Sequence, residues 1–285
     1  MAGLPPKLIG AGFMLLWAIS ISTAMTLAKH LSPDVHNLVV MFMRFFFGLL
    51  FFSPFVVRAG IKGFHTSRPL LQMIRVVCSC AAVGCTYYAY RHLPLALATS
   101  IGMTGPLFTT LLAMLILKDK VSFSKWACIF VGYLGVLVMV RPHELEVNLA
   151  VWIELLANLF AAFSIIGVKV LSRTDSVLTI MLYTNTVTTL LTGLLVYWVW
   201  LTPSLHDFLL LIAIGGFGVF SQFSATSALK YADPSYLAPF EYTRMCFAIP
   251  VGYFLFAELP TLWMLAGTLM IIGATYALTR LELNS

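Results

Sequence analysis

The chain has 285 residues, of which 60% are hydrophobic and only 10% are charged. Soluble domains carry about 25% charged residues, so this composition excludes a soluble globular protein and predicts an integral membrane protein. The net charge of +6 reflects basic residues at the predicted membrane edges and does not indicate nucleic-acid binding.

Ten apolar segments are each long enough to cross a bilayer core of about 30 Å, which needs about 20 helical residues. In chain order they are expected over residues 8–28, 38–57, 70–90, 95–117, 124–140, 149–170, 177–200, 208–231, 235–256 and 259–278. The connections between them are short, so any function is expected to be carried by helices within the bilayer. The first segment lacks a small-residue cleavage site before Lys29 and is interpreted as a retained anchor.

The distribution of basic residues predicts the orientation of these segments. With the N-terminus in the cytoplasm, the outer side holds three basic residues, Lys29, Arg91 and Arg141. The inner side then holds Lys7, Arg58, Lys62, Arg68, Lys118, Lys120, Lys125, Lys169, Arg173, Lys230 and Arg280. Because cytoplasmic loops are enriched in lysine and arginine, we expect a multi-pass protein of the cell inner membrane with both termini cytoplasmic.

The cysteines and histidines give no sign of a metal site or a disulfide framework. All five cysteines lie in hydrophobic segments, and all six histidines lie in loops or at segment ends. An odd number of cysteines among apolar neighbours is typical of small packing side chains. We therefore expect no metal, no cofactor and no catalytic residues.

The two halves of the chain resemble each other. Residues 96–119, "ALATSIGMTGPLFTTLLAMLILKD", align with residues 235–258, "SYLAPFEYTRMCFAIPVGYFLFAE", at a displacement of 139. This predicts one repeat over residues 8–141 and a second over 149–280. Five is odd, so the second repeat enters the membrane from the opposite side. The predicted fold class is an all-α membrane protein with ten transmembrane helices as two inverted five-helix repeats. Inverted repeats favour transport, although duplication that only doubles a stable bundle is the alternative.

Several stretches together resemble the drug/metabolite transporter superfamily, in its ten-helix EamA-type branch. They are "RFFFGLLFFSPFVV", "SRPLLQMIRVV", "LPLALATSIGMTGPLFTTLLAMLI", "VGYLGVLVMVRPH" and "YLAPFEYTRMCFAIPVGYFLFAE". Together with "YWVWLTPSLHDFLLLIAIGGFG", they are also similar to bacterial S-adenosylmethionine uptake transporters. The likeness implies uptake or exchange of a charged nucleoside-type metabolite across the inner membrane.

Other functions remain open at this point. An exporter of amino acids, drugs or metabolites with the same fold is the nearest alternative. A non-transporting membrane scaffold and a membrane-embedded enzyme are alternatives of other classes. The sequence holds no G-x-x-x-x-G-K-[ST] motif, so ion or substrate gradients are expected to drive transport. The expected partners are a small-molecule substrate and the lipid bilayer, with a monomer or homodimer as the assembly.

Glu241 and Arg244 are the main candidates for a binding site. A charge at the bilayer centre costs about 2.5 to 3.5 kcal/mol, so both need a reason to lie inside a span. One interpretation is that Glu241 is the counter-ion of a cationic substrate or carries a proton, while Arg244 binds a carboxylate. The other is an ion pair between residues three apart on a helix, which neutralises itself. At the same positions of the first repeat stand Gly102 and Gly105, which leave room for a cavity.

Further candidates recur at helical spacing near these charges. On the fourth span they include Thr99, Gly102 and Met103, and on the ninth span Tyr242 is a candidate to stack on a purine ring or a cation. Aromatic or polar side chains that are weaker candidates are Trp17, Tyr88 and Gln222. Kinks are expected at Pro106, Pro239 and Pro250.

Arg44 and Glu154 are predicted at equal depth below the outer surface, in different repeats. That placement permits an ion pair that forms in only one conformation and acts as an outer gate. The alternative is that Arg44 extends outward to the membrane surface among phenylalanines. Arg75, near the inner surface, is expected to extend to the surface in the same way.

Overall fold

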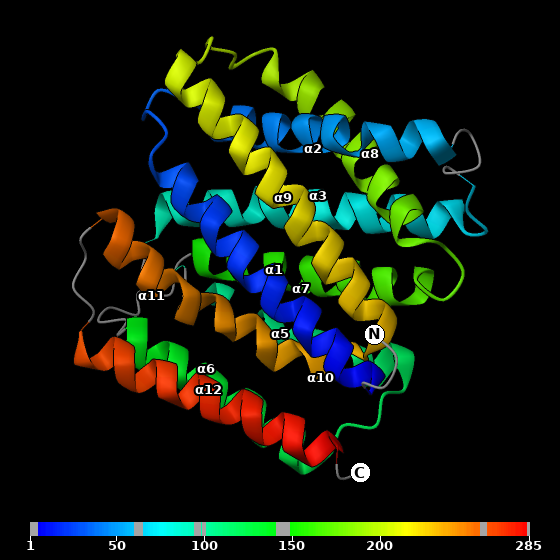
Figure 1. The fold of residues 1–285 in the computed structure, drawn as a ribbon, viewed down its shortest axis with the longest axis vertical. Helices are drawn as coiled ribbons and strands as arrows, with labels where there is room; N and C mark the ends of the chain where they lie inside the picture. The colour runs from blue at the N-terminus through cyan, green and yellow to red at the C-terminus, as the bar shows by residue number, and fades with distance from the viewer. Residues whose placement is uncertain are drawn as a thin grey trace.

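The computed structural model describes residues 5–59, 65–93, 98, 101–140, 149–256 and 261–283, and every regular element in these residues is a helix (Figure 1). Seven of the helices are long and apolar enough to cross a membrane. They are α1 (Pro6–Lys29), α2 (Asn37–Ala59), α3 (Pro69–His92), α7 (Leu149–Leu171), α8 (Val177–Val196), α9 (Leu205–Tyr231) and α12 (Leu262–Leu283). The predicted all-helical membrane fold is confirmed.

Three further spans are shorter or interrupted. The fifth is α6 (Phe123–Val140). The fourth contains α5 (Gly105–Leu112), which continues into the π-helix η2 (Ala113–Leu117). The ninth consists of α10 (Pro234–Leu237), the 3₁₀-helix η3 (Ala238–Tyr242) and α11 (Thr243–Phe256). Of the expected distortions, Pro106 lies in the first turn of α5, Pro239 lies in η3 and Pro250 lies inside α11.

The surface of the bundle is apolar and its interior is unusually polar. Leu115, Leu194 and Leu269 are among many large apolar side chains exposed on the perimeter. Buried positions include hydroxyl, amide and charged side chains. In a bilayer the exposed leucines meet lipid tails, and only side chains that face other helices can be polar at low cost.

The pattern of helix contacts is preserved when each helix is replaced by its equivalent in the other repeat. When the spans are matched in order, α1 corresponds to α7, α2 to α8, α3 to α9, α5 to α11 and α6 to α12. The contact between α1 and α9 then has its counterpart in α7 and α3, and the contact between α1 and α11 in α7 and α5. The pairs α2–α8 and α6–α12 each map onto themselves. This is the contact pattern of two inverted five-helix repeats.

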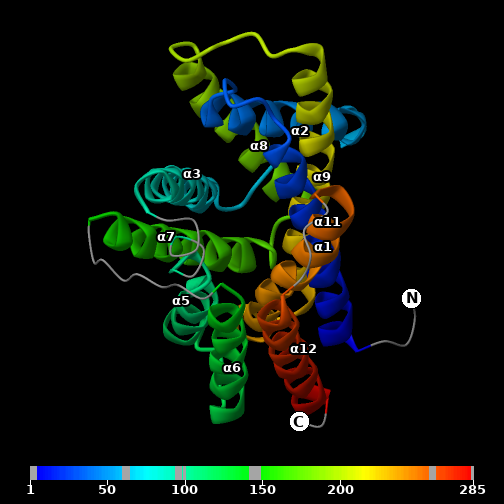
Figure 2. The same ribbon diagram turned by 90° about the vertical axis from the view of Figure 1, so that its left-hand side faces the viewer.

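The two self-matching pairs lie at opposite ends of the molecule. Figures 1 and 2 both show α2 and α8 at one end and α6 and α12 at the other, with α1, α3, α7, α9 and α11 between them. The described ends of α1 and α12 nearest the termini lie on one side of the bundle, on the right in Figure 1. We call this the terminal side and the other the opposite side.

Glycines bring α6 and α12 into close contact. A Cβ placed on Gly267 would overlap Met139 Cγ and the carbonyl oxygen of Gly135. Small residues at such a crossing allow the two backbones to approach closely. The resulting van der Waals contact matters because the hydrophobic effect does not drive helices together inside a bilayer.

Gly267→Leu is therefore expected to force α6 and α12 apart and to destabilise the protein by about 1 to 3 kcal/mol. The thermal midpoint of purified protein in detergent measures the effect. Gly273→Leu is the matched control on the same helix, because a Cβ there meets nothing within 4 Å. Equal midpoints for the two variants would contradict close packing at Gly267.

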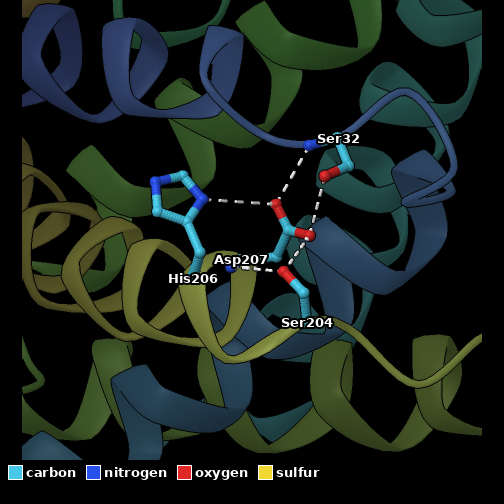
Figure 3. A network of polar contacts seen from close by, with 4 residues as sticks. All are labelled: Ser32, Ser204, His206 and Asp207. Carbon is cyan, nitrogen blue, oxygen red and sulfur yellow. Dashed lines mark hydrogen bonds and ion pairs between the residues drawn. The ribbon is translucent and has the colours of Figure 1, made fainter.

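Asp207 ties the two repeats together on the opposite side (Figure 3). Ser32, in the turn between α1 and α2, donates to it from its backbone nitrogen at 3.0 Å and its hydroxyl at 2.9 Å. Ser204, the N-cap of α9, donates its hydroxyl to Asp207 Oδ2 at 2.7 Å and accepts the Asp207 N–H at 3.1 Å. His206 Nδ1 lies 4.0 Å from Asp207 Oδ1. Ser204 thus caps α9, and the Asp207 carboxylate orients the capping hydroxyl and holds the α1–α2 turn.

Arg75 joins the repeats near the terminal side. Its guanidinium donates to Thr184 Oγ1, to the carbonyl of Ile180 at 3.1 Å and to Gln72 Oε1 at 3.3 Å. Gln72 in turn donates to Asp175 at 3.0 Å. The expectation that Arg75 extends to the membrane surface is wrong, because its side chain is 4% exposed and finds neutral acceptors on α8 instead of water.

Candidate functional site

The fourth and ninth spans are both interrupted, at equivalent positions. In the fourth span a turn at Met103 and Thr104 precedes α5, and in the ninth span η3 ends at Tyr242 before α11 begins at Thr243. The displacement of 139 residues between the repeats maps Thr104 onto Thr243. Interrupted helices of this kind line substrate sites in many transporters, because their backbone groups face protein or a polar cavity.

Side chains of α1 and α7 donate hydrogen bonds to backbone carbonyls at the two breaks. Ser22 on α1 donates to the carbonyl of Arg244 at 2.9 Å. Asn158 on α7 donates to the carbonyl of Ile101 at 2.9 Å and to Thr104 Oγ1 at 3.1 Å. Since α1 and α7 are equivalent helices, each repeat supports the break in the other in the same way.

The two breaks meet through Arg244 and Met103. Arg244 Nη2 lies 3.4 Å from Met103 Sδ, a weak acceptor, and Arg244 Nε has no hydrogen-bond partner among the described residues. The side chain is only partly exposed. A guanidinium has five donors in a planar fork, so these contacts leave most of its hydrogen-bonding capacity for an anion.

Glu241 lies in the middle of the bundle, one residue before the end of η3. That element packs against α1, α5, α6 and α12, so its surroundings are protein rather than lipid. The neighbours Phe240 and Tyr242 are buried, whereas Glu241 keeps part of its surface accessible. Arg244 acts on its carboxylate electrostatically. No direct ion pair between them is found in the described part of the chain, so the self-neutralising pair is not formed in this conformation.

Glu154 lies on α7 and faces the same arginine. Its side chain is 1% exposed, Thr86 of α3 lies beside it, and Arg244 acts on it electrostatically. Atom Oε2 has no hydrogen-bond partner among the described side chains. Arg244 is therefore within electrostatic range of two carboxylates, Glu154 and Glu241, and the described residues show no direct ion pair with either.

The predicted pair of Arg44 and Glu154 is not formed. Arg44 runs along α9, where a Cβ on Gly218 would lie 2.8 Å from Arg44 Nε, and its guanidinium lies 5.5 Å from the centre of the Phe45 ring. Helix α2 packs on α8 and α9, whereas α7 packs on α3 and α5. The different packing of these two helices, which depth alone does not reveal, separates the two residues.

Other predicted residues lie near the breaks but with different roles. The Tyr242 side chain is fully buried with Met103, Val136 and Ile271, and its ring is in contact with Gly132, so it packs the bundle and has no free face for a purine. Trp17 packs against the hydrophobic cluster that contains Tyr236 and Phe240. Gly102 is partly buried beside the break.

The remaining candidates are not brought to the breaks by the described contacts. Tyr88 is 38% exposed and stacks on His92, with ring centres 4.1 Å apart. Gln222 on α9 accepts a hydrogen bond from Asn185 of α8 at 3.2 Å. Thr99 lies outside the described residues.

A pocket of about 420 Å³ opens on the terminal side, away from the three charges. Tyr236 lines it and also packs on Phe240 at 5.6 Å between ring centres, whereas Glu241 is not among the lining residues. Its charged lining consists of Lys7, Lys118, Lys120, Lys125, Asp119 and Asp233. Below it, Asp119 accepts a hydrogen bond from Ser235 at 3.1 Å, and Lys169 pairs with Asp233 at 3.0 Å. The contact of Asp119 with Ser235 joins the two repeats on the terminal side.

Asp119 provides a pH test of that contact. Burial, followed by the nearby charge of Asp233, raises the pKa of Asp119 above its ordinary value of 3.8. An acid with a raised pKa in the folded state ionises more readily when the protein is unfolded. The free energy of unfolding therefore falls as the pH rises above the ordinary pKa of 3.8. Asp119→Asn removes the effect and keeps an acceptor for Ser235. The thermal midpoint of Asp119→Asn should rise relative to that of the wild type as the pH increases above about 4; parallel curves would contradict this account.

Sequence reasoning missed Asn158, Ser22 and the role of Glu154 beside Arg244. A signal for two of them was present: Asn158 follows Glu154 by four residues, which puts both on one face of the apolar first half of α7. Ser22 carries no such signal, since serine in a span most often bonds its own helix.

Comparison with known proteins gives a consistent result. The model of the EamA-like transporter family matches residues 8–141 and again residues 148–280. The S-adenosylmethionine uptake transporter of Rickettsia prowazekii is 30% identical over 93% of this chain and 90% of its own length. The riboflavin transporter of Brucella anthropi is 28% identical, covering 86% of this chain and 89% of the relative. The pseudopaline exporter CntI of Pseudomonas aeruginosa is 26% identical, covering 96% and 97%.

One solved crystal structure shares the fold, with a TM-score of 0.82 and 15% sequence identity over 97% of this chain and 98% of that chain. The named relatives are transporters and none is an enzyme. With the family model matching almost the whole length in two copies, the chain belongs to the EamA-like transporter family and is a multi-pass membrane transporter.

Proposed function

We propose that this transporter carries a small metabolite with both a cationic group and a carboxylate, by alternating access. The observation that carries the proposal is the meeting of two equivalent helix breaks at Arg244 and Met103. In inverted-repeat transporters such a place is the substrate site, and the two repeats exchange conformations to open it to either side.

The charges at the breaks suit a substrate of this kind. Arg244 has donors left over for a carboxylate, and Glu241 is a partly accessible counter-ion for a sulfonium or ammonium group. S-adenosylmethionine carries both groups, which is in keeping with the relatives that take it up. In this proposal the contacts of Asp119 with Ser235 and of Lys169 with Asp233 on the terminal side separate when the protein opens inward.

The terminal side corresponds in our proposal to the cytoplasm of a bacterial cell, with the protein in the inner membrane. The basic lining of the pocket on that side supports this orientation, because cytoplasmic edges are enriched in lysine. Fusion of a reporter that is active only in the cytoplasm to the C-terminus tests it, and an inactive reporter on an inserted protein would refute it.

Transport is tested with purified protein in liposomes. Labelled S-adenosylmethionine, amino acids and nucleotide sugars are offered in turn, with empty liposomes as the control. We expect saturable accumulation of a compound that bears a cation and a carboxylate, blocked by the unlabelled compound. Accumulation only of compounds without these two groups would refute the proposed substrate class, and no accumulation under any gradient would refute the transport proposal.

A further inference from the structure

The pocket on the terminal side has no part in the proposed transport site. Its volume of about 420 Å³ lies in the range of pockets that bind small molecules. Its lining is mostly polar and includes four lysines, Lys7, Lys118, Lys120 and Lys125. Because neither Glu241 nor Arg244 lines it, a ligand bound there would be distinct from the transported one.

The pocket has an excess of positive charge. Asp233 is neutralised by Lys169, whose Nζ lies 3.0 Å from its carboxylate. That leaves Asp119 as the other acid among the lining residues. Lys118 and Lys120 form no ion pair with any described residue. Four lysines and one remaining carboxylate give the lining a net charge of about +3, which attracts an anion.

Lys118 occupies its position in a strained backbone conformation. It follows the last residue of η2 with φ 57° and ψ 34°, which is the left-handed region. Among the described residues it is the only one other than glycine with a positive φ. Glycine is the usual residue at such a helix end, because a Cβ crowds the backbone there. A lysine in this place is less stable than a glycine, which is consistent with a binding role for its ammonium group.

The pocket lies at one edge of the membrane-spanning region. Helix α1 begins one residue before Lys7 and α9 ends at Tyr231, and both of these residues line the pocket. Large apolar side chains are exposed close by in sequence: Ile116, near the end of η2, is 47% exposed, and Phe123, the first residue of α6, is 88% exposed. Basic side chains beside a surface that meets lipid tails form the kind of site that binds an anionic lipid headgroup. A soluble phosphate would use the lysines alone.

We propose that this pocket binds the phosphate of an anionic phospholipid, whose acyl chains lie along the exposed apolar side chains of η2 and α6. The four lysines act as point charges around the phosphate. They belong to the first repeat, whereas the lining contributed by α9 and α10 belongs to the second. A lipid bound there therefore bridges the two repeats beside the contact of Asp119 with Ser235 and stabilises the conformation described above.

Native mass spectrometry of the purified protein, titrated with phosphatidylglycerol, tests the site. Phosphatidylcholine, which has no net charge, is the reference lipid. We expect the wild type to bind phosphatidylglycerol in preference, and Lys118→Gln with Lys120→Gln to weaken that binding about thirtyfold. Arg68→Gln with Arg173→Gln is the matched control, because it removes the same charge from exposed positions outside the pocket. No preference in the wild type, or an equal loss in both double variants, would overturn the proposal.

Lys118→Gly separates a loss of binding from a loss of folding. Glycine adopts the left-handed conformation without strain, so the thermal midpoint of the lipid-free protein should rise by a few degrees. Its affinity for phosphatidylglycerol should nevertheless fall about fivefold, since one lysine is lost. An unchanged affinity in this variant would overturn the assignment of the pocket.

Inorganic phosphate distinguishes a lipid from a soluble ligand. Phosphatidylglycerol should raise the thermal midpoint of the wild type and leave that of Lys118→Gln with Lys120→Gln unchanged. Inorganic phosphate should have no such effect on either protein. A rise with inorganic phosphate as large as that with phosphatidylglycerol would overturn the lipid as the occupant. None of these measurements depends on transport, so the proposed function can fail or succeed independently.

Discussion

Replacing Glu241 with glutamine is expected to abolish accumulation of a cationic substrate in liposomes while the protein still folds and inserts. Glutamine has nearly the same shape but no charge, so the substrate cation loses its counter-ion in a site of low dielectric constant. The loss is about 3 kcal/mol, which is roughly a hundredfold in affinity. Uptake of labelled substrate, normalised to the amount of reconstituted protein, measures it.

The matched control for Glu241→Gln is Asp34→Asn, which removes an equal charge from an exposed turn. It should transport as the wild type does. An elution profile from size-exclusion chromatography in detergent shows whether each variant is folded. Normal uptake by well-folded Glu241→Gln protein would rule out the counter-ion role.

Asp207→Ala is expected to cause the largest loss of stability among the predicted variants. Two hydroxyls and one backbone N–H donate to this carboxylate, and removing it leaves the Ser32 N–H without its partner (Figure 3). We expect the thermal midpoint to fall on the order of 10 °C.

Asp207→Asn keeps one acceptor oxygen and should fall between the wild type and Asp207→Ala. Thermal melting of the detergent-solubilised protein distinguishes the three. Midpoints for Asp207→Ala within the error of the wild type would show that the α1–α2 turn is held by packing of α1 on α9 instead.

Much of the fold could be predicted from the sequence because membrane helices obey a simple length rule. The ten segments and the inverted repeat followed from apolar length, an odd number per repeat and one displacement of 139 residues. Glu241 and Arg244 were selected as site candidates from cost alone, since a charge in hydrocarbon needs a partner. The structure places both residues at a break between helices.

What the sequence could not supply was the pairing of helices. Arg44 and Glu154 share a predicted depth, but α2 and α7 pack on different neighbours, so depth does not give contact. Arg75 was expected to reach the surface, yet acceptors on α8 hold it inside. Tyr242 was expected to meet the substrate, but Gly132 opens a space that its ring fills. Each difference between expectation and structure concerns which face of a helix meets which partner, and that is decided by tertiary packing.

The equivalent breaks of the two repeats have one more consequence. Their backbones match, but one carries Glu241 and Arg244 where the other carries Gly102 and Gly105. The architecture is symmetric while its polarity is lopsided. A zwitterionic substrate would therefore bind in one fixed orientation. Its two charged groups would lie against the second repeat, from whichever side of the membrane it entered.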